Sequence, residues 1–250
     1  MLQAWGVTEK GTRPTNQDRF AIDEQRQLCV IADGMGGHNA GEIAARTAVD
    51  VVVDVVNAGQ GDGWPFGVEP SLSYAGNLIR TAIYHANVQV LEHAAHSVAF
   101  AGMGTTLVAA LVVEGQLSVA HAGDSRLYRL EDGRLRQLTG DDSWMATMMA
   151  HDPGADAAML QYHPMRHVLT NVVGSRRRTD VHVVEEMLAD GDSLLLTTDG
   201  VHGVLEDRWL ERQLAGRGDL AAVASDIVRA AIARGSRDNC TAVVARYFRD

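Results

Sequence analysis

The order of the predicted helices and strands indicates an α+β fold built on mostly antiparallel sheet. Two long helical segments, over residues 41–56 and 72–96, follow one another, and three strand-like segments then follow without a helix between them. Tight turns such as Asp132-Gly133 join these strands, and turns of this length connect antiparallel neighbours. This order lacks the regular strand–helix alternation of a doubly wound parallel sheet.

Three short strands are predicted before the first helix. Apolar and β-branched residues place them at residues 2–7, 19–22 and 28–32. The first helix, from about Gly41 to Val56, carries its apolar residues along one stripe, as an amphipathic helix does. Residues 57–71 are rich in Gly and Pro and are predicted to form the loop that leads into the second helix.

The second half of the chain is predicted to be richer in strands. Strands are expected at residues 105–113, 117–122, 125–130, 181–184, 194–197 and 241–247. Helices are expected at residues 207–214 and 220–233. The stretch over 143–167 has an irregular helical pattern, because Pro153 and Pro164 interrupt it.

The composition is typical of a globular protein with one large domain, and two small domains are the alternative. The chain has 250 residues, of which 46% are hydrophobic and 22% are charged. The formal net charge of −10 argues against nucleic acid or an anionic membrane as the main partner, since both attract basic surfaces. No signal-peptide pattern or membrane-length apolar run is visible. We therefore expect a cytoplasmic monomer.

Aspartates gather at the ends of the predicted strands. The five are Asp18, Asp33, Asp124, Asp199 and Asp238. Glycine directly follows Asp33 and Asp199, which lets the backbone approach a ligand closely enough for its carbonyl to coordinate as well. A single Asp-Gly pair is commonly only a turn. Five carboxylates at strand ends repel one another, so they converge only around cations or with some of them protonated.

Ligation by oxygen alone favours hard ions such as Mg²⁺ or Mn²⁺ over zinc or copper. Two such ions can share a water, lower its pKa, and hold the attacking and leaving oxygens of a phosphate ester. The aspartate pattern therefore predicts metal-dependent hydrolysis of a phosphate ester.

Eight segments of the sequence, taken in order, resemble the metal-dependent type 2C serine/threonine phosphatases in their compact bacterial form. They are RPTNQD (13–18), ADGMGGHNAGE (32–42), GMGTTLVAA (102–110), HAGDSRLYRL (121–130), QLTGDDSW (137–144), VLTNVVGS (168–175), TTDGVHG (197–203) and SRDNCTAVV (236–244). The resemblance spans essentially the whole chain. It implies one catalytic domain over residues 1–250, a four-layer α-β-β-α sandwich of two antiparallel sheets, and a flap over about 143–167.

The resemblance also implies a function and its metal ligands. The expected reaction is hydrolysis of phosphoserine and phosphothreonine in proteins at a dinuclear Mn²⁺ or Mg²⁺ centre, opposing a serine/threonine kinase. Asp33 would bridge the two ions, and the carbonyl of Gly34 would be a further ligand. Asp199 and Asp238 would complete the first metal site.

Three more roles follow from the resemblance. Asp18 would act through a metal-bound water. Asp124, together with Asp199, would hold a third and weaker metal. Arg13 would bind the substrate phosphate, a task that suits the planar fork of donors on its guanidinium.

The sequence departs from the family pattern at several positions. Asp142 stands where the family usually has histidine in LTxDHS, and Gly203 stands where an acidic residue or Asn is common, which weakens the case for the third metal. Eukaryotic relatives have a histidine, proposed as general acid, at the position of Met35. His38 is nearby at a different spacing and would instead cap or orient the next helix, with a metal-bound water supplying the proton.

Two other sequence features have less definite interpretations. His163 and His167 are spaced as on one helical turn, but Pro164 disrupts that helix, so we expect them on the surface of the flap. The run Arg176–Arg178 could contact phosphorylated protein substrates, although a solvated loop is the preferred interpretation.

Two alternative functions remain open. A non-catalytic phosphoprotein-binding module on the same fold would be favoured by missing core aspartates, and all of them are present. A small-molecule phosphatase with an aspartyl nucleophile would end its strand in a DxD pair, whereas the strand here ends in Asp33-Gly34-Met35.

Overall fold

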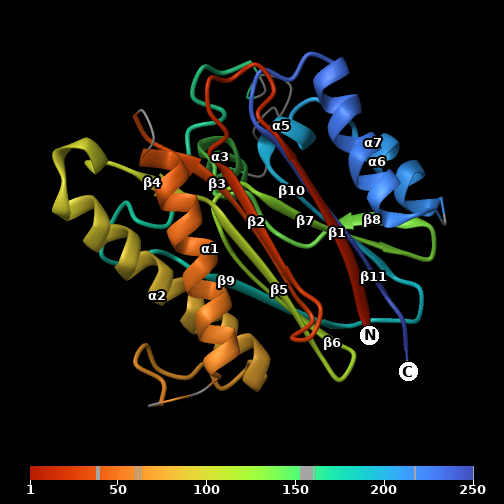
Figure 1. Cartoon of the computed structure of the whole chain (residues 1–250), viewed down its shortest axis with the longest axis horizontal. Coiled ribbons are helices and arrows are strands. Elements are labelled where there is room, and N and C mark those ends of the chain that lie inside the picture. Colours follow the sequence, from red (N-terminus) through yellow and green to blue (C-terminus); the bar gives the residue numbers. More distant parts are fainter. Residues whose placement is uncertain are drawn as a thin grey trace.

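The computed structural model describes residues 1–37, 40–59, 61, 63–152, 160, 162–216 and 218–249. Two antiparallel sheets lie face to face, and a pair of long helices covers the outer face of each (Figure 1). This four-layer α-β-β-α arrangement confirms the predicted fold. Within the described ranges, no helix has both the length and the apolar composition needed to cross a membrane.

Each sheet takes its strands from distant parts of the chain. The first sheet has the order β1 (Leu2–Glu9), β11 (Cys240–Tyr247), β10 (Ser193–Thr197), β7 (Arg126–Glu131) and β8 (Arg134–Gln137). The second has the order β2 (Asp18–Asp23), β3 (Leu28–Met35), β5 (Leu107–Val113), β6 (Gln116–Ala122) and β9 (His182–Met187), and β4 (Gly104–Thr105) pairs with the end of β3. Because β1 pairs with β11 along its whole length, the two ends of the chain form neighbouring strands.

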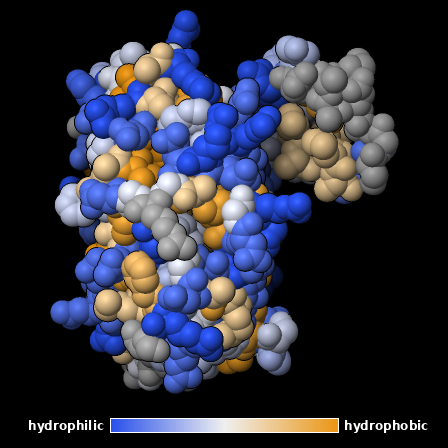
Figure 2. Space-filling view, turned by 90° about the vertical axis from the view of Figure 1, so that its right-hand side faces the viewer, coloured by the Kyte–Doolittle hydropathy of each residue, from blue (hydrophilic) through white to orange (hydrophobic). Residues whose placement is uncertain are grey.

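The long helices form the two outer layers. Helices α1 (Ala40–Ala58) and α2 (Tyr74–His96) pack on the second sheet, and α6 (Asp207–Ala215) and α7 (Leu220–Ala233) pack on the first. Figure 2 shows the side of the molecule that carries α6 and α7, where hydrophobic residues occur in small separate areas among polar ones. Scattered apolar residues of this kind are normal on a globular surface.

Strand β3 shows why its sequence is apolar without interruption. Val30 and Ala32 pack toward α1 and α2, whereas Cys29 and Ile31 pack toward the other sheet. Side chains alternate between the two faces of a strand, and here both faces are buried. The run of buried residues ends at Asp33, which is only partly exposed. The core of the fold therefore carries this carboxylate to the edge of the sheet.

Several elements differ from the sequence prediction. The strand expected over 105–113 is divided at Thr106, whose backbone N–H donates to the Asp33 carbonyl instead of continuing one ladder. Helix α5 (Asp199–His202) begins at an aspartate that was expected to end a strand. Strand β8 and the 3₁₀ turn η1 (Val98–Phe100) were not predicted, because neither has a long apolar run.

The predicted flap is only partly covered by the described residues. Helix α3 (Trp144–His151) begins at the N-cap Ser143, whose hydroxyl accepts a hydrogen bond from the backbone of Ala146. Residues 153–159 and 161, including Pro153, lie outside the described residues. The remaining flap residues, 162–167, lead back to the body of the protein at Thr170, whose N–H donates to the Asp142 carbonyl over 2.8 Å.

Helix α5 and strand β11 meet so closely at Gly200 that a side chain has no room. A Cβ atom on Gly200 would lie 1.9 Å from the backbone oxygen of Asn239. We predict that Gly200→Ala destabilises the protein by about 1–3 kcal/mol, the usual range for overpacking. Thermal unfolding measures the effect, with Gly140→Ala as the control because a Cβ there meets no atom within 4 Å. Equal melting temperatures for the two variants would contradict this packing.

Candidate active site

One surface cavity is lined by most of the residues that the sequence predicts to be functional. The cavity has a volume of about 280 Å³, and its lining includes Arg13, Asp33, Gly34, Asp124, Asp199 and Asp238. Asp18 is buried nearby, as the cross-strand partner of Asp33. Arg13 and Asp238 are 225 positions apart in the sequence, yet their side chains touch. The cavity is therefore assembled from both ends of the chain and from both sheets.

The backbone around Asp33 is held by two threonines. Its carbonyl accepts hydrogen bonds from the Thr106 N–H at 2.9 Å and from the Thr105 hydroxyl at 2.8 Å. Its own N–H donates to the Thr106 hydroxyl at 2.9 Å, and that hydroxyl also contacts Ser125 at 2.7 Å. These bonds satisfy the carbonyl and the N–H of Asp33, so its backbone is fixed at the cavity wall.

Gly34 occupies a position that only glycine can fill. A Cβ atom there would lie 2.0 Å from the Gly41 carbonyl oxygen and 2.8 Å from the Gln17 carbonyl oxygen. The Gly34 N–H donates to this same Gln17 oxygen over 3.1 Å. The start of α1 and the segment before β2 therefore close around Gly34, which leaves its backbone at the cavity wall.

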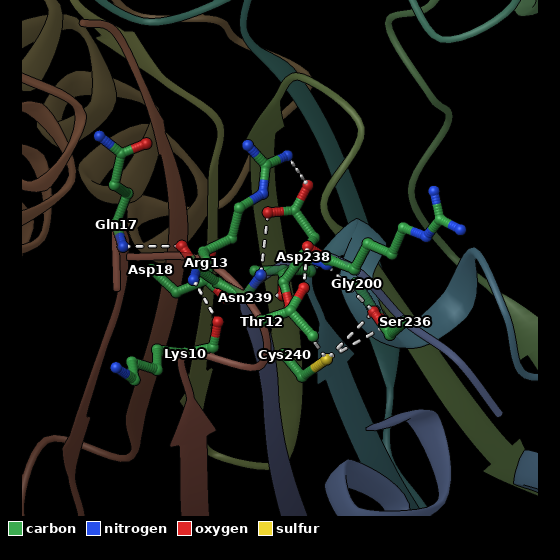
Figure 3. Close-up of polar contacts among 12 residues, drawn as sticks. Lys10, Thr12, Arg13, Gln17, Asp18, Gly200, Ser236, Asp238, Asn239 and Cys240 are labelled. Carbon is green, nitrogen blue, oxygen red and sulfur yellow. Dashed lines mark hydrogen bonds and ion pairs between the residues drawn. The ribbon is translucent and has the colours of Figure 1, made fainter. Parts of the chain in front are cut away.

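A single asparagine joins the loop after β1 to the start of β11 (Figure 3). The Nδ2 group of Asn239 donates to the carbonyls of Lys10 and Thr15, at 3.0 and 2.9 Å. Its Oδ1 accepts from the Gln17 N–H at 2.8 Å. These three bonds use both Nδ2 hydrogens and one lone pair of Oδ1, and they fix the loop that carries Arg13 against Asn239, the residue next to Asp238.

Arg13 and Asp238 form an ion pair at the cavity rim. Nη2 of Arg13 donates to Oδ2 of Asp238 over 2.6 Å, and both side chains remain partly exposed (Figure 3). The hydrogen bond that Arg13 donates to Asp238, together with the negative charge of Asp238, raises the pKa of Arg13 above its ordinary value. The guanidinium is thus a permanent positive charge beside a group of carboxylates, with donors left for a further anion.

Asp18 is held beneath the cavity by hydroxyl groups. Its Oδ2 accepts from Thr198 at 2.8 Å and from Thr241 at 2.6 Å. Its Oδ1 is buried, and among the described residues it has no hydrogen-bond partner. Burial raises the pKa of Asp18 to about 7, although the two threonines act in the opposite direction. A buried acceptor without a donor is costly, so this oxygen suits a bound water or cation.

The other carboxylates also resist ionisation. Burial raises the pKa of Asp33 well above its ordinary value, and the charges of Asp18, Asp199 and Asp124 raise it further. Burial and then the charge of Asp199 raise the pKa of Asp124 to about 7. Burial and then the charge of Asp238 raise the pKa of Asp199. These carboxylates are mutually repulsive, and Arg13 alone cannot offset them.

The donor set fits hard divalent cations. Every selected ligand is oxygen, and Oδ1 of Asp199 is another buried acceptor without a partner in the described structure. The described part of the chain contains no group of three His, Cys, Asp or Glu side chains already disposed around one point. Asp238 is paired with Arg13 through Oδ2, and its Oδ1 accepts from the Asn239 N–H at 2.9 Å.

Several residues around the site were not selected from the sequence. Thr198 and Thr241 bind Asp18, Thr106 binds Asp33, and their hydroxyls carry no sequence signal beyond ordinary strand residues. His167, which was expected on the flap surface, lines the cavity. His163 instead stacks on Trp144, with ring centroids 4.2 Å apart. His38, considered as a proton donor, lies outside the described residues.

A larger cavity adjoins the carboxylates. Its volume is about 850 Å³, and its wall includes Asp124, Asp199 and Asp238 as well as residues of α3 and α5. Met145 and Met149 give it an apolar side, and Arg166 and Arg237 give it positive charge. A space of this size beside the carboxylates could hold an extended chain rather than a phosphate group alone.

Asp142, the departure from the family pattern, is the centre of a hydrogen-bond network. Its Oδ2 accepts from the Gly123 N–H at 2.9 Å and from Asn171 Nδ2 at 2.7 Å. Its Oδ1 lies 3.1 Å from Nε2 of His182. Burial alone would raise the pKa of Asp142, but the hydrogen bonds from His182 and its other partners lower it. Since Gly123 precedes Asp124, this network holds the turn that presents Asp124.

Comparisons with known proteins agree over the whole chain. Residues 9–235 match the sequence model of the family described as protein phosphatase 2C. The serine/threonine phosphatase stp of Listeria welshimeri is 29% identical over 249 residues, which cover 95% of this chain and 92% of that protein. The crystal structure of the Mycobacterium tuberculosis serine/threonine phosphatase PstP/Ppp matches with a TM-score of 0.86 and 26% identity, covering 99% of both chains. A structure of the PstP catalytic domain in complex with two manganese ions matches with a TM-score of 0.80 and 26% identity, again over 99% of both chains.

The pair of Asp142 and His182 predicts how stability depends on pH. The hydrogen bond to Asp142 raises the pKa of His182 above 6.5. The protonated histidine therefore stabilises the fold fully below its unfolded pKa, and this contribution is lost as the pH rises through the raised pKa. His182→Gln should lower the melting temperature more at about pH 6 than at about pH 9.

The free energy of unfolding lost through His182→Gln should differ between the two pH values by less than about 1 kcal/mol, because His182 is half exposed and solvent screens its pair with Asp142. Thermal melts of the two proteins in matched buffers measure it. The same loss at both pH values would contradict a charged pair.

Proposed function

Because the chain belongs to the protein phosphatase 2C family, we propose that it hydrolyses phosphoserine and phosphothreonine in proteins with the help of Mn²⁺ or Mg²⁺. The observation that carries this proposal is the cavity whose wall contains Asp33, Asp199 and Asp238 beside the guanidinium of Arg13. The carboxylates have too few positively charged side chains around them, so they suit hard metal ions as ligands. The guanidinium of Arg13 suits the phosphate of the substrate.

The residues that would hold the ions are those at the cavity wall, together with Asp18 beneath it. Asp33 would bridge two ions, with the Gly34 carbonyl, Asp199 and Asp238 as the other protein ligands. Asp18 would act through water, and Asp124 with Asp199 would hold a third ion. When bound, such ions supply Lewis-acid chemistry, because they lower the pKa of the attacking water and offset charge on the phosphate.

The protein's own groups supply binding and orientation. Arg13 would bind the phosphate oxygens as a planar donor and give up its contact with Asp238 to the metal site. Thr105 and Thr106 hold the Asp33 backbone, so that the point from which this carboxylate leaves the chain stays fixed. Water reaches the cavity from the open rim, where Arg13 is exposed.

The adjoining cavity supports a protein rather than a small metabolite as the substrate. Its apolar wall of Met145 and Met149 and its arginines surround the same aspartates, so an extended segment could lie there with its phosphorylated residue over the carboxylates. A phosphatase of this kind opposes a serine/threonine kinase. Because the cavity draws on both chain ends, we propose that residues 1–250 act as one catalytic domain.

Loss of a central carboxylate tests the metal site. We predict that Asp33→Asn and Asp238→Asn each lower Mn²⁺-dependent hydrolysis of an aryl phosphate by about a hundredfold or more, since about 3 kcal/mol of barrier lowering corresponds to this factor. EDTA should abolish the wild-type activity. Asp50→Asn, an exposed change on α1, is the control and should leave the rate unchanged.

Circular dichroism shows whether the variants remain folded. A folded Asp33→Asn protein that turns over within a few-fold of the wild type would contradict the proposed site. No metal-dependent turnover by the wild type would instead favour the non-catalytic binding module.

Removal of the arginine tests phosphate binding. We predict that Arg13→Ala raises KM for an aryl phosphate more than it lowers kcat, because Arg13 mainly binds the phosphate dianion of the ground state. Arg19→Ala, which removes an exposed arginine from β2, is the control. A large fall in kcat at unchanged KM would assign Arg13 to the transition state instead.

A further inference from the structure

A separate cavity of about 470 Å³ lies between α2 and the loop of residues 174–180. It shares no lining residue with the active-site cavity or with the groove next to it. Its wall includes Phe66, Arg80, Tyr84, Arg177 and Arg178, and we call it the arginine groove. The wall also contains Asp180, which pairs with Arg176, so the groove is a concave, mainly basic and aromatic surface outside the site described above.

The backbone of this loop is fixed on one side by a buried asparagine. Asn87 of α2 is 2% exposed, and its Nδ2 donates to the carbonyls of Arg176 and Arg177, at 3.1 and 3.4 Å. Its Oδ1 accepts from the Gly174 N–H at 2.8 Å. The arginine side chains are exposed, as in the solvated loop that the sequence favoured, but their backbone is anchored.

A second buried asparagine holds the other side of the loop. Oδ1 of Asn171 accepts from the hydroxyl of Thr179 at 2.9 Å and from the N–H of Asp180 at 3.1 Å. Between these two anchors, the backbone positions of Arg177 and Arg178 are fixed. A loop built in this way presents its side chains with a small loss of backbone entropy when a ligand binds.

The charges of the loop are only partly neutralised. Arg176 pairs with Asp180 at 2.9 Å, whereas Arg177 and Arg178 make no ion pair with the described residues. Arg80 donates to the Gly67 carbonyl and lies 5.1 Å from the centroid of the Tyr84 ring. The donor forks of such arginines suit carboxylates and phosphates.

The groove also has an aromatic floor. Phe66 lies against Tyr84 and His85, with ring centroids 5.2 and 4.9 Å apart. Aromatic faces give an extended peptide an apolar contact, and a volume of this size is typical of a ligand site. A membrane or a nucleic acid would need a wide basic face, which a protein of this net charge does not favour.

The groove is connected rigidly to the active site. Val173, just before the loop, exchanges backbone hydrogen bonds with Thr105 at 2.9 and 3.0 Å. The hydroxyl of Thr105 in turn donates to the carbonyl of Asp33. A segment held in the groove therefore stays at a constant position relative to Asp33, which raises the local concentration of the rest of the same chain.

We propose that the arginine groove is a docking site for an acidic segment of the phosphoprotein substrate, through Arg177 and Arg178. This inference rests on the proposed function, and it adds a second contact outside the reaction centre. Asp, Glu or additional phosphorylated residues would supply the same anionic chemistry. Substrates with such a segment would be selected through KM rather than through kcat.

Charge reversal tests the groove. The double variant Arg177→Glu/Arg178→Glu is compared with Arg208→Glu/Arg212→Glu, which makes the same charge change at exposed positions of α6. Fluorescence anisotropy measures binding of a labelled Asp/Glu-rich peptide without phosphoserine, and steady-state kinetics measure turnover of a phosphoprotein that contains the same acidic segment. The groove variant should weaken peptide binding and raise KM by about tenfold or more, with kcat and aryl phosphate hydrolysis unchanged.

The α6 variant should behave as the wild type in every assay. The proposal is overturned if both variants bind the acidic peptide equally, or if the groove arginines affect binding to anionic lipid vesicles and not to the peptide. A second peptide, with phosphoserine in place of the acidic residues, shows which source of negative charge binds more tightly. Aryl phosphate turnover by the wild type reports on the proposed function separately, so a failure there is distinguishable from a failure of the groove.

Discussion

The repulsion among buried carboxylates is the constraint on which the rest of this structure depends. Asp33, Asp199 and Asp124 all have raised pKa values because the fold removes them from water and places them near one another. Such an arrangement is unfavourable by itself, and a surface position would relieve it. The surrounding protein nevertheless holds these carboxylates together. Cations bound among them would offset their negative charge and explain why the arrangement is kept.

Much of the molecule serves to hold that group in place. The two sheets are stacked so that the end of β3 meets the start of β11, and Asn239 joins the β1 loop to the same point. Glycine is required at Gly34 and Gly200 because neighbouring backbone approaches to about 2 Å of where a Cβ would be. The fixed parts of the site are therefore backbone, whereas Arg13 and Asp238 are partly exposed side chains that pair with each other at the rim.

Most of the strands and the carboxylates could be predicted from the sequence, because apolar runs that end in aspartate are local signals, whereas the four layers came from the resemblance to the type 2C phosphatases. Sequence reasoning could not find contacts between distant segments. The hydroxyls of Thr198 and Thr241 meet Asp18 across 180 and 223 positions, and nothing local distinguishes them from other threonines near strands. The partnership of Asp142 with His182 was equally hidden. Asp199 was predicted to end a strand, because a helix of four residues is too short to give a recognisable sequence pattern.

Direct measurement of metal binding tests the central claim most simply. Isothermal titration calorimetry of the metal-free protein with Mn²⁺, checked by equilibrium dialysis and elemental analysis, counts the ions bound to each chain. If cations complete the carboxylate group, the wild type binds at least two ions per chain and its melting temperature rises with Mn²⁺ concentration. A protein that binds less than one ion per chain, with an unchanged melting temperature, would contradict the account.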